Sequence, residues 1–123
     1  MEIRGREIKF LRTVGASCEI AEICPDGELS RITEMLQSKR TGDNVKAMAA
    51  VIVALNKGYE EAKAFDEEGY KPRPLGMREV MLLSDDDFTT LFTEATAAFY
   101  GEVPTIEVEP PKKNKKAKAE TSD

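Results

Sequence analysis

The chain has 123 residues, of which 41% are hydrophobic, and this is enough for one domain with a single core. It contains no histidine, so it lacks the commonest general acid–base group and metal ligand, and neither a Ser-His-Asp nor a Cys-His site can form within it. Two cysteines cannot supply a four-ligand structural zinc site.

The net charge of −5 is unevenly distributed along the chain. Up to Pro110 there are 13 basic and 21 acidic side chains, whereas the final PKKNKKAKAETSD carries 5 basic and 2 acidic ones. An acidic body argues against a protein that coats nucleic acid, because neutralising phosphates requires a basic face. The longest apolar run, AMAAVIVAL at 47–55, is far shorter than the ~20 residues that span a bilayer, and MEIRGREIKF has no signal-peptide pattern. We therefore expect a cytoplasmic protein without a membrane partner.

The first 24 residues predict a hairpin followed by a helix. Apolar and polar residues alternate around residues 4–6, which predicts two short strands joined by a turn. Thr13 is suited to cap a helix that ends before the Pro-Asp-Gly turn at 25–27. The apolar spacing predicts that this helix turns inward a face made of Val14, Cys18, Ala21 and Ile23 or Cys24.

Two further helices are predicted between residues 28 and 66. GELSRITEMLQSKR places four apolar residues on one face: Leu29, Ile32, Met35 and Leu36. Residues 41–44 are predicted to form a loop with a helix cap at Asp43. A helix of ~20–24 residues follows, because apolar residues step by three and four along one stripe. This stripe consists of Val45, Met48, Ile52, Leu55, Tyr59 and Ala62.

The two halves of this long helix differ in character. Nearly every residue from 47 to 55 is apolar, so we expect burial on most sides. After Asn56 only the stripe stays apolar, and four charged residues are expected to face water: Lys57, Glu60, Glu61 and Lys63. Glycine slightly lowers the stability of a helix, so Gly58 at an interior position predicts a close contact with another helix. The helix is expected to end at 66–69, and the prolines within 70–74 exclude its continuation.

The last predicted elements lie between residues 75 and 101. Residues 75–83 predict a short helix with Met77, Val80 and Met81 inward. Ser84 is suited to cap a following helix that carries Phe88, Leu91, Phe92, Ala95 and Phe99 on one face and stops at Gly101. The predicted fold is mainly α, with one domain over 1–108 of about four to five helices and a short N-terminal β-hairpin. A disordered lysine-rich tail is expected over 109–123.

The two cysteines lie six residues apart in CEIAEIC. On a continuous helix this spacing rotates the side chains by about 600° and separates the Cα atoms by about 9 Å, which is too far for a disulfide. We interpret Cys18 and Cys24 as buried thiols that pack like small apolar residues.

Other polar and aromatic clusters have structural explanations. CPDGEL and the acidic run 84–87 lack the alternating ligands of a calcium loop, so turn formation and helix capping account for them. The carboxylates at 60–61 and 66–68 are placed on a solvated helix face, with an acidic patch for a basic partner as the alternative. The aromatic residues Tyr59, Tyr70, Phe88, Phe92 and Phe99 lack interleaved basic residues, so core packing is favoured over stacking on bases. No catalytic residue, cofactor or metal is expected.

The order of these features resembles a known family. A hairpin leads into FLRTVGASCEIAEICPDGELSRI, and VIVALNKGYEEAKAFDEEGYKPRPLGMREVMLL precedes a Phe-rich helix and a lysine-rich end. Over residues 1–108 this arrangement is similar to the small tail assembly chaperones of siphophages and prophages of Gram-positive bacteria. The resemblance rests on GREIKFL-TVGA, EI-CPDG-LSRI and VALN-GYE, none of which is a catalytic signature.

The resemblance implies a mainly helical, non-enzymatic protein of the host cytoplasm. Members bind the tape measure protein during tail building, keep its hydrophobic helices soluble, help recruit tail tube subunits and are absent from the finished virion. Many also exist in a longer form made by programmed ribosomal frameshifting, and KKNKK is where adenine-rich, slippery codons would lie. The implied partners are therefore the tape measure protein, the tail tube protein and a longer frameshifted form of the chain itself.

A candidate face for binding a partner or a second copy follows from the half-exposed stripe and the methionines, whose flexible thioethers suit adaptable surfaces. Its predicted members are Leu55, Tyr59, Ala62, Met77 and Met81. The methionines at 35, 48, 77 and 81 also fit a core position. The alternative function is a small regulatory or nucleic-acid-associated module, with a helix-turn-helix after Thr13 and a tail that contacts phosphate. Against it, SRITEMLQSKR offers only three basic residues.

Overall fold

The computed structural model describes residues 1–37 and 41–101. In chain order the elements are β1 (Glu2–Ile3), β2 (Arg6–Glu7), α1 (Val14–Glu22), η1 (Pro25–Gly27), η2 (Leu29–Arg31), α2 (Ile32–Leu36), α3 (Thr41–Asp66), α4 (Met77–Met81) and α5 (Asp85–Tyr100). The predicted mainly helical fold with an N-terminal hairpin is therefore confirmed. The predicted tail over 109–123 lies outside the described residues, as do residues 102–108 at the end of the predicted domain.

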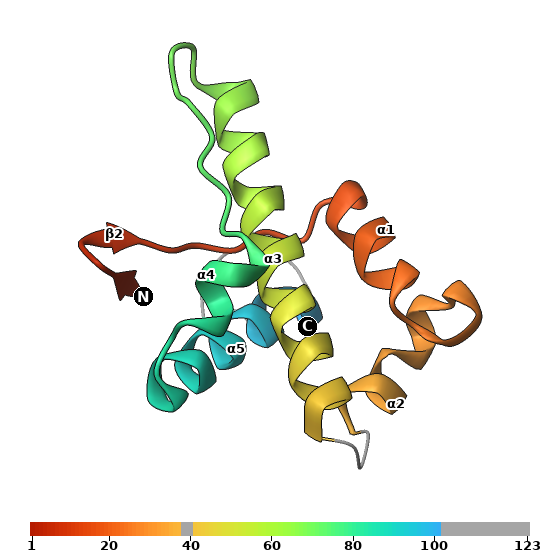
Figure 1. The fold of residues 1–123 in the computed structure, drawn as a ribbon. Helices are drawn as coiled ribbons and strands as arrows, with labels where there is room; N and C mark the ends of the chain where they lie inside the picture. Colours follow the sequence, from red (N-terminus) through yellow and green to blue (C-terminus); the bar gives the residue numbers. More distant parts are fainter. Residues whose placement is uncertain (38–40, 102–123) are drawn as a thin grey trace, which may run out of the picture.

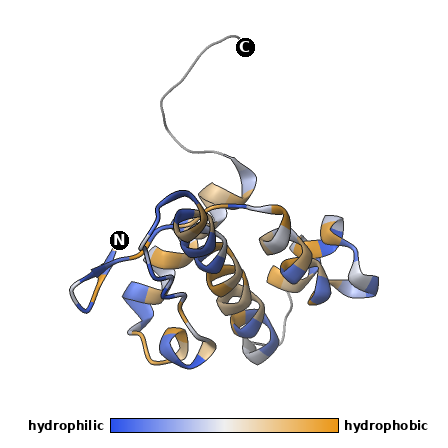
Figure 2. Cartoon of the chain, turned by 90° about the horizontal axis from the view of Figure 1, so that it is seen from above, coloured by the Kyte–Doolittle hydropathy of each residue, from blue (hydrophilic) through white to orange (hydrophobic). Residues whose placement is uncertain are grey.

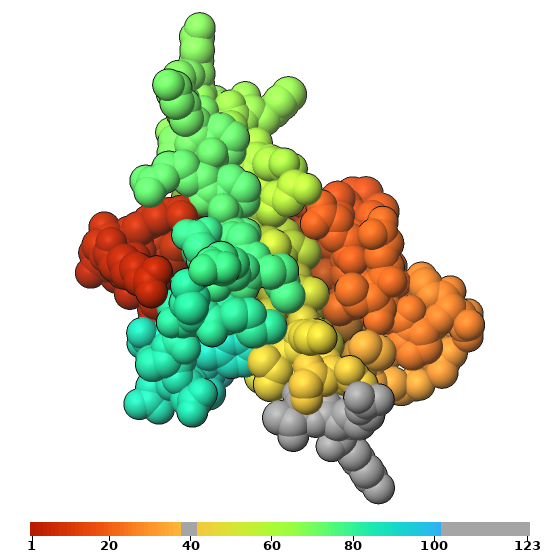
Figure 3. Space-filling model, viewed as in Figure 1, coloured from red at the N-terminus to blue at the C-terminus, as the bar shows by residue number. Residues whose placement is uncertain are grey.

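The long helix α3 organises the molecule. In Figure 1 it runs through the middle, with α1 and α2 on one side and α4 on the other, and α3 contacts α1, α2, α4 and α5. In the space-filling view of Figure 3 the N-terminal hairpin stands out on one flank and α1 with α2 on the opposite flank. The core therefore consists mainly of the faces that these elements turn towards α3.

The N-terminal hairpin pairs β1 with β2 in antiparallel register, with Ile3 opposite Arg6. Arg4 and Gly5 at its turn have φ values of 52° and 78°, which is the left-handed geometry that a two-residue hairpin turn needs. Ile8 follows β2 and is only 1% exposed, so it fastens the hairpin to the core. The predicted turn at residues 4–6 is confirmed.

Helix α1 begins where predicted but presents a different face. The Thr13 hydroxyl accepts a hydrogen bond of 3.0 Å from the amide of Ala16, which confirms the N-cap. The predicted inward face is wrong for Val14, which is 84% exposed, and for Cys18, which is also exposed, whereas Cys24 is buried as predicted. The helix carries two apolar stripes, and the one that is buried includes Ile20, whose burial removes more apolar area from water than that of Cys18.

Helix α3 starts earlier than predicted, at Thr41, so the predicted loop over 41–44 is wrong. Residues 41–44 instead form the first turn, where the carboxylate of Asp43 suits the positive end of the helix dipole. The apolar half is buried as expected, with Ala47, Ala49, Val51, Ile52, Ala54 and Leu55 in the core. The expected end is also confirmed, because the helix stops at Asp66.

Gly58 marks the predicted close contact on α3. A Cβ atom at this position would lie 2.5 Å from the carbonyl oxygen of Leu11 and 3.0 Å from the Thr13 hydroxyl. The neighbour is thus the backbone that leads into α1, together with Ala16 of the helix itself. Only glycine allows α3 to approach this segment so closely.

Helix α4 is shorter than the predicted 75–83. Val80 is 1% exposed, but Met77 and Met81 are 40% and 43% exposed, so their predicted inward positions are wrong. A helix of five residues turns only one side chain fully inward, and Leu75 before it is also buried.

Helix α5 follows the prediction closely. The Ser84 hydroxyl accepts a hydrogen bond from the Asp87 amide, and Gly101 closes the helix at φ 71°. Leu91, Ala95 and Phe99 are buried, while Phe88 and Phe92 pack partly buried against the core. Coloured by hydropathy, the turn of the N-terminal hairpin is mainly hydrophilic, whereas the helices carry most of the hydrophobic colour (Figure 2).

Candidate interaction surfaces

The five residues of the predicted partner face do not form one surface. Leu55 is fully buried in the core. Tyr59 and Ala62 are half-buried and line a shallow hollow with Leu11, whereas Met81 lines a different hollow beside Val80 and Phe88. Of the predicted set, only the two methionines of α4 are exposed, and Leu82 beside them is 59% exposed.

A second apolar surface lies on α1, on the stripe predicted to face inward. Val14, Cys18 and Ala21 are spaced by four and three residues and therefore follow one another along one side of the helix. Leu29 of η2 lines an open groove together with these three residues, and the groove has a volume of about 470 Å³. We call these four residues the α1 groove.

One charged residue, Arg12, borders the α1 groove, and its side chain already has partners within the chain. The guanidinium of Arg12 donates hydrogen bonds to the Phe99 carbonyl (2.7 Å) and to the Ser17 hydroxyl (3.0 Å). It also lies 4.3 Å from the centre of the Phe99 ring, a cation–π contact. Arg12 therefore anchors α1 to the end of α5 while the rest of the lining stays apolar or uncharged.

The sequence patterns missed a buried polar pair on α3. Asn56 is fully buried and Glu60 is 3% exposed, so the prediction that Glu60 faces water is wrong. The cause is the segment 70–75, here called the strap, which runs back along α3 and covers both side chains. Pro72 and Pro74 have no amide hydrogen, so the free amides of the strap alternate. The amide of Arg73 donates to Glu60 (2.9 Å) and that of Leu75 donates to Asn56 (2.8 Å).

The spacing of this pair matches the spacing of the strap. Two residues of a proline-rich extended chain advance about 6 Å, and the four residues of helix from 56 to 60 also advance about 6 Å. The Asn56 side-chain amide additionally donates to the Lys9 carbonyl at 3.0 Å. One turn of α3 thus joins the hairpin segment to the strap. The signal in the sequence was Asn56 and Glu60 at helical spacing together with Pro72 and Pro74 at alternate positions.

The carboxylate of Glu60 stays charged despite its burial. Burial alone would raise the pKa of Glu60, but hydrogen bonds from Tyr70 and the Arg73 amide, with the charges of Arg6 and Lys63, hold this pKa below its ordinary value. The hydrogen bond between Tyr70 and Glu60 also raises the pKa of the Tyr70 hydroxyl. The arrangement holds the strap on α3.

The two cysteines differ in their surroundings. Both thiols are free, with Cys18 exposed on the α1 groove and Cys24 buried, so the prediction of two buried thiols is wrong for Cys18. The Cys24 thiol donates to the Ile20 carbonyl, and burial raises its pKa.

The turn and cap interpretations of the acidic motifs hold. Asp26 lies in a turn with φ 58° and pairs with Arg31 at 2.7 Å, and Asp85 to Asp87 form the first turn of α5. Within residues 1–37 and 41–101, no group of three or more acidic, cysteine or histidine side chains is placed to hold a metal ion. In the same part of the chain, every helix falls short of the length and apolar character needed to cross a bilayer.

Comparison of the chain with protein-family models, with curated proteins and with solved structures finds no match.

Proposed function

We propose that the protein is a tail assembly chaperone that works by binding alone, holding an apolar helix of a tape measure protein in the α1 groove. The observation that carries the proposal is the apolar stripe of α1, on which Val14 and Cys18 are exposed and Ala21 is half-buried, beside the half-buried Leu29. A helical face that is apolar and solvent-exposed is a surface for a partner. The resemblance of residues 1–108 to tail assembly chaperones supplies the identity of that partner.

The shape of the α1 groove suits a helix as its occupant. From Val14 to Ala21 the stripe extends over about 10 Å of helix, which corresponds to two turns of a partner helix. An amphipathic helix that presents apolar residues at i, i+3 or i+4 and i+7 would match this spacing. So small a contact favours weak, reversible binding, which a chaperone needs in order to release its client to the growing tail.

The exposed side chains of α4 provide a second, adaptable surface in this proposal. Met77, Met81 and Leu82 are exposed together, and unbranched thioethers fit partners of varied shape. We propose that this surface binds the tail tube protein or another copy of the chain, including a longer frameshifted form, in the host cytoplasm.

The nucleic-acid alternative has less support. Helix α2, which would read the bases in a helix-turn-helix, spans five residues and is therefore only about 7 Å long. A salt-titrated binding assay with duplex DNA separates the two functions, and measurable affinity at physiological salt would favour the alternative.

Co-expression with a tape measure protein of the same phage or prophage tests the proposal. We expect the wild-type chain to raise the soluble fraction of that protein and Val14→Glu to lose most of the effect, because a charge is placed in the apolar groove. Val14 is the first residue of α1, where an acidic side chain suits the helix dipole, so the fold should be retained. The matched control is Phe65→Glu, a substitution of an apolar residue on α3 that is 92% exposed and lies outside the groove.

The two variants are expected to differ in their effect on the solubility of the tape measure protein. Phe65→Glu should act like the wild type, and Val14→Glu should leave the tape measure protein in the pellet. Equal solubility with both variants, or no effect of the wild-type chain, would contradict the proposal.

A further inference from the structure

The end of helix α5 lies beside the α1 groove. The guanidinium of Arg12, which borders this groove, donates to the Phe99 carbonyl at 2.7 Å and to the Ser17 hydroxyl at 3.0 Å. Ser17 also lines the groove, so the width of one guanidinium group and two hydrogen bonds separates it from the last turn of α5. The chain that follows α5 therefore starts next to the groove.

The sequence after α5 has an apolar and a polar face. Gly101 ends the helix at φ 71°, and the following stretch, EVPTIEVEP over 102–110, lies beyond the described residues. Alternate side chains of an extended chain share a face, so Pro104, Ile106 and Val108 form one apolar face. The opposite face carries Val103 and three polar residues: Thr105, Glu107 and Glu109.

The length of residues 102–108 matches the groove. From Tyr100 to Pro104 an extended chain reaches about 13 Å, which is more than the gap that the Arg12 guanidinium bridges. From Pro104 to Val108 the chain extends over about another 13 Å, and the stripe of the α1 groove extends over about 10 Å of helix. The apolar face of this segment is therefore close enough and long enough to cover the groove.

The charges of the segment suit this position. Its charged residues are acidic, whereas the charged side chain that borders the groove is the cation Arg12. With the apolar face on the groove, an extended segment directs Glu107 away from α1 and into water, so that no carboxylate is buried. The contact therefore covers apolar surface without the cost of burying a charge.

We propose that residues 102–108 cover the α1 groove of their own chain and that a client helix displaces them. A segment joined to α5 by a few residues has a millimolar effective concentration, so even a weak contact keeps it on the groove for much of the time. The apparent affinity for a client is reduced by the fraction of grooves that are covered, so only a helix with enough apolar contact displaces the segment. This regulation of client binding rests on the proposed function, whereas the covering of the groove does not.

The rate at which a neutral alkylating reagent labels Cys18 in the full chain measures the covering, because this thiol lies in the groove. We expect Ile106→Ser/Val108→Ser to raise that rate about threefold or more, as for a groove covered about two thirds of the time. Serine adds no charge that would alter the thiolate. The matched control, Val103→Ser, removes an apolar side chain from the opposite face and should leave the rate unchanged. Cys24 should stay far slower in every variant, because it reacts only when the core unfolds.

The dependence on protein concentration identifies the occupant. A segment of the same chain protects Cys18 equally at all concentrations, whereas protection that grows with concentration would assign a second copy and overturn the proposal. Equal rates in the wild type and the double variant, or equal acceleration by Val103→Ser, would overturn it as well. No tape measure protein is present in this experiment, so its failure leaves the co-expression result unchanged. Faster labelling of the double variant without any gain of solubility in co-expression would instead refute the proposed function and retain the covered groove.

Discussion

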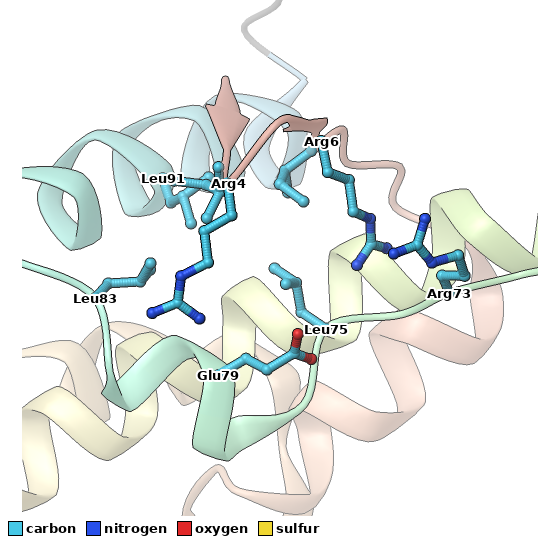
Figure 4. A pocket seen from close by; sticks show the side chains of 9 residues that line it. Arg4, Arg6, Arg73, Leu75, Glu79, Leu83 and Leu91 are labelled. Atoms are coloured by element: carbon cyan, nitrogen blue, oxygen red, sulfur yellow. The ribbon is translucent and has the colours of Figure 1, made fainter.

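The hydroxyl of Tyr70 donates a hydrogen bond of 2.6 Å to the carboxylate of Glu60, which is 3% exposed. This bond fixes the beginning of the strap on α3, ten residues earlier in the chain. Together with the Arg73 amide it surrounds a charged group that would otherwise be costly to bury. The strap in turn supplies Arg73 and Leu75 to the lining of a pocket that also includes residues of the hairpin and α5 (Figure 4), so the stability of this contact and the shape of that pocket are linked.

Glu60→Gln should lower the free energy of unfolding at pH 7 by about 1.5–3 kcal/mol, the value of hydrogen bonds to a charged group. Because the pKa of Glu60 is held below its ordinary value in the fold, its contribution is complete above the unfolded pKa and is lost as the pH falls through the folded pKa. Urea unfolding at several pH values should therefore show the difference between wild type and variant shrinking below about pH 4.3. Glu61→Gln, at the exposed neighbouring position, serves as the control and should change little. A difference that grows as the pH falls would contradict this role for Glu60.

Asn56→Asp should destabilise the fold by about 2–4 kcal/mol at pH 7. The introduced carboxylate can still accept from the Leu75 amide, but it cannot donate to the Lys9 carbonyl and would face that oxygen with a negative charge. Burial raises the pKa of such a carboxyl group, so the penalty should fall as the pH drops and the group gains a proton. Chemical denaturation at pH 7 and pH 4 measures this, and a penalty that is the same at both values would exclude the proposed cause.

Gly58→Ala and Gly42→Ala should have different effects although both lie in α3. A methyl group at position 58 would meet the Leu11 carbonyl oxygen at 2.5 Å, so we expect a loss of about 1–3 kcal/mol in spite of the better helix propensity of alanine. At position 42 no described residue beyond the helix's own backbone lies within 4 Å of the added atom, so the effect should be neutral or stabilising by up to about 1 kcal/mol. Thermal or urea unfolding compares the two variants. Equal effects would show that α3 does not pack on the 11–13 segment as described.

The cysteines should differ sharply in reactivity. A thiol reagent should label Cys18 rapidly in the native protein, while Cys24 reacts only on unfolding, because it is buried, its thiol donates to Ile20 and its pKa is raised. Titration with a chromogenic disulfide should release one equivalent quickly under native conditions and two in denaturant. Cys18→Ser is the control and should remove the rapid phase. Two rapid equivalents in the wild type would place Cys24 at the surface.

Much of the fold could be predicted from local chemistry. Thr13, Ser84 and Gly101 act on the few residues beside them, so their positions as caps follow from sequence alone. The apolar half of α3 is buried on most sides for the same reason, since its composition leaves no alternative face.

Other features depended on contacts between distant segments. Helix α1 has two apolar stripes with similar periodicity, and only the packing against α3 decides that Ile20 is buried and Val14 is exposed. The sequence pattern predicts that Glu60 lies on the surface, and only the contact with the strap, which begins ten residues further along the chain, buries it. The pocket lined by residues 3–8 and 73–91 joins the hairpin to segments far along the chain, and no local sequence pattern predicts that proximity.

The central claim is that the α1 groove binds a helix of the tape measure protein, and site-specific crosslinking tests it most directly. A photoreactive group can be attached to Cys18, which is exposed in the groove while Cys24 is buried. In the presence of the tape measure protein, this probe should give a crosslinked adduct that Val14→Glu strongly reduces. The same group on Cys18→Ser/Phe65→Cys, at an exposed position outside the groove, should give none. An adduct of equal yield from both positions, or from position 65 alone, would contradict the account.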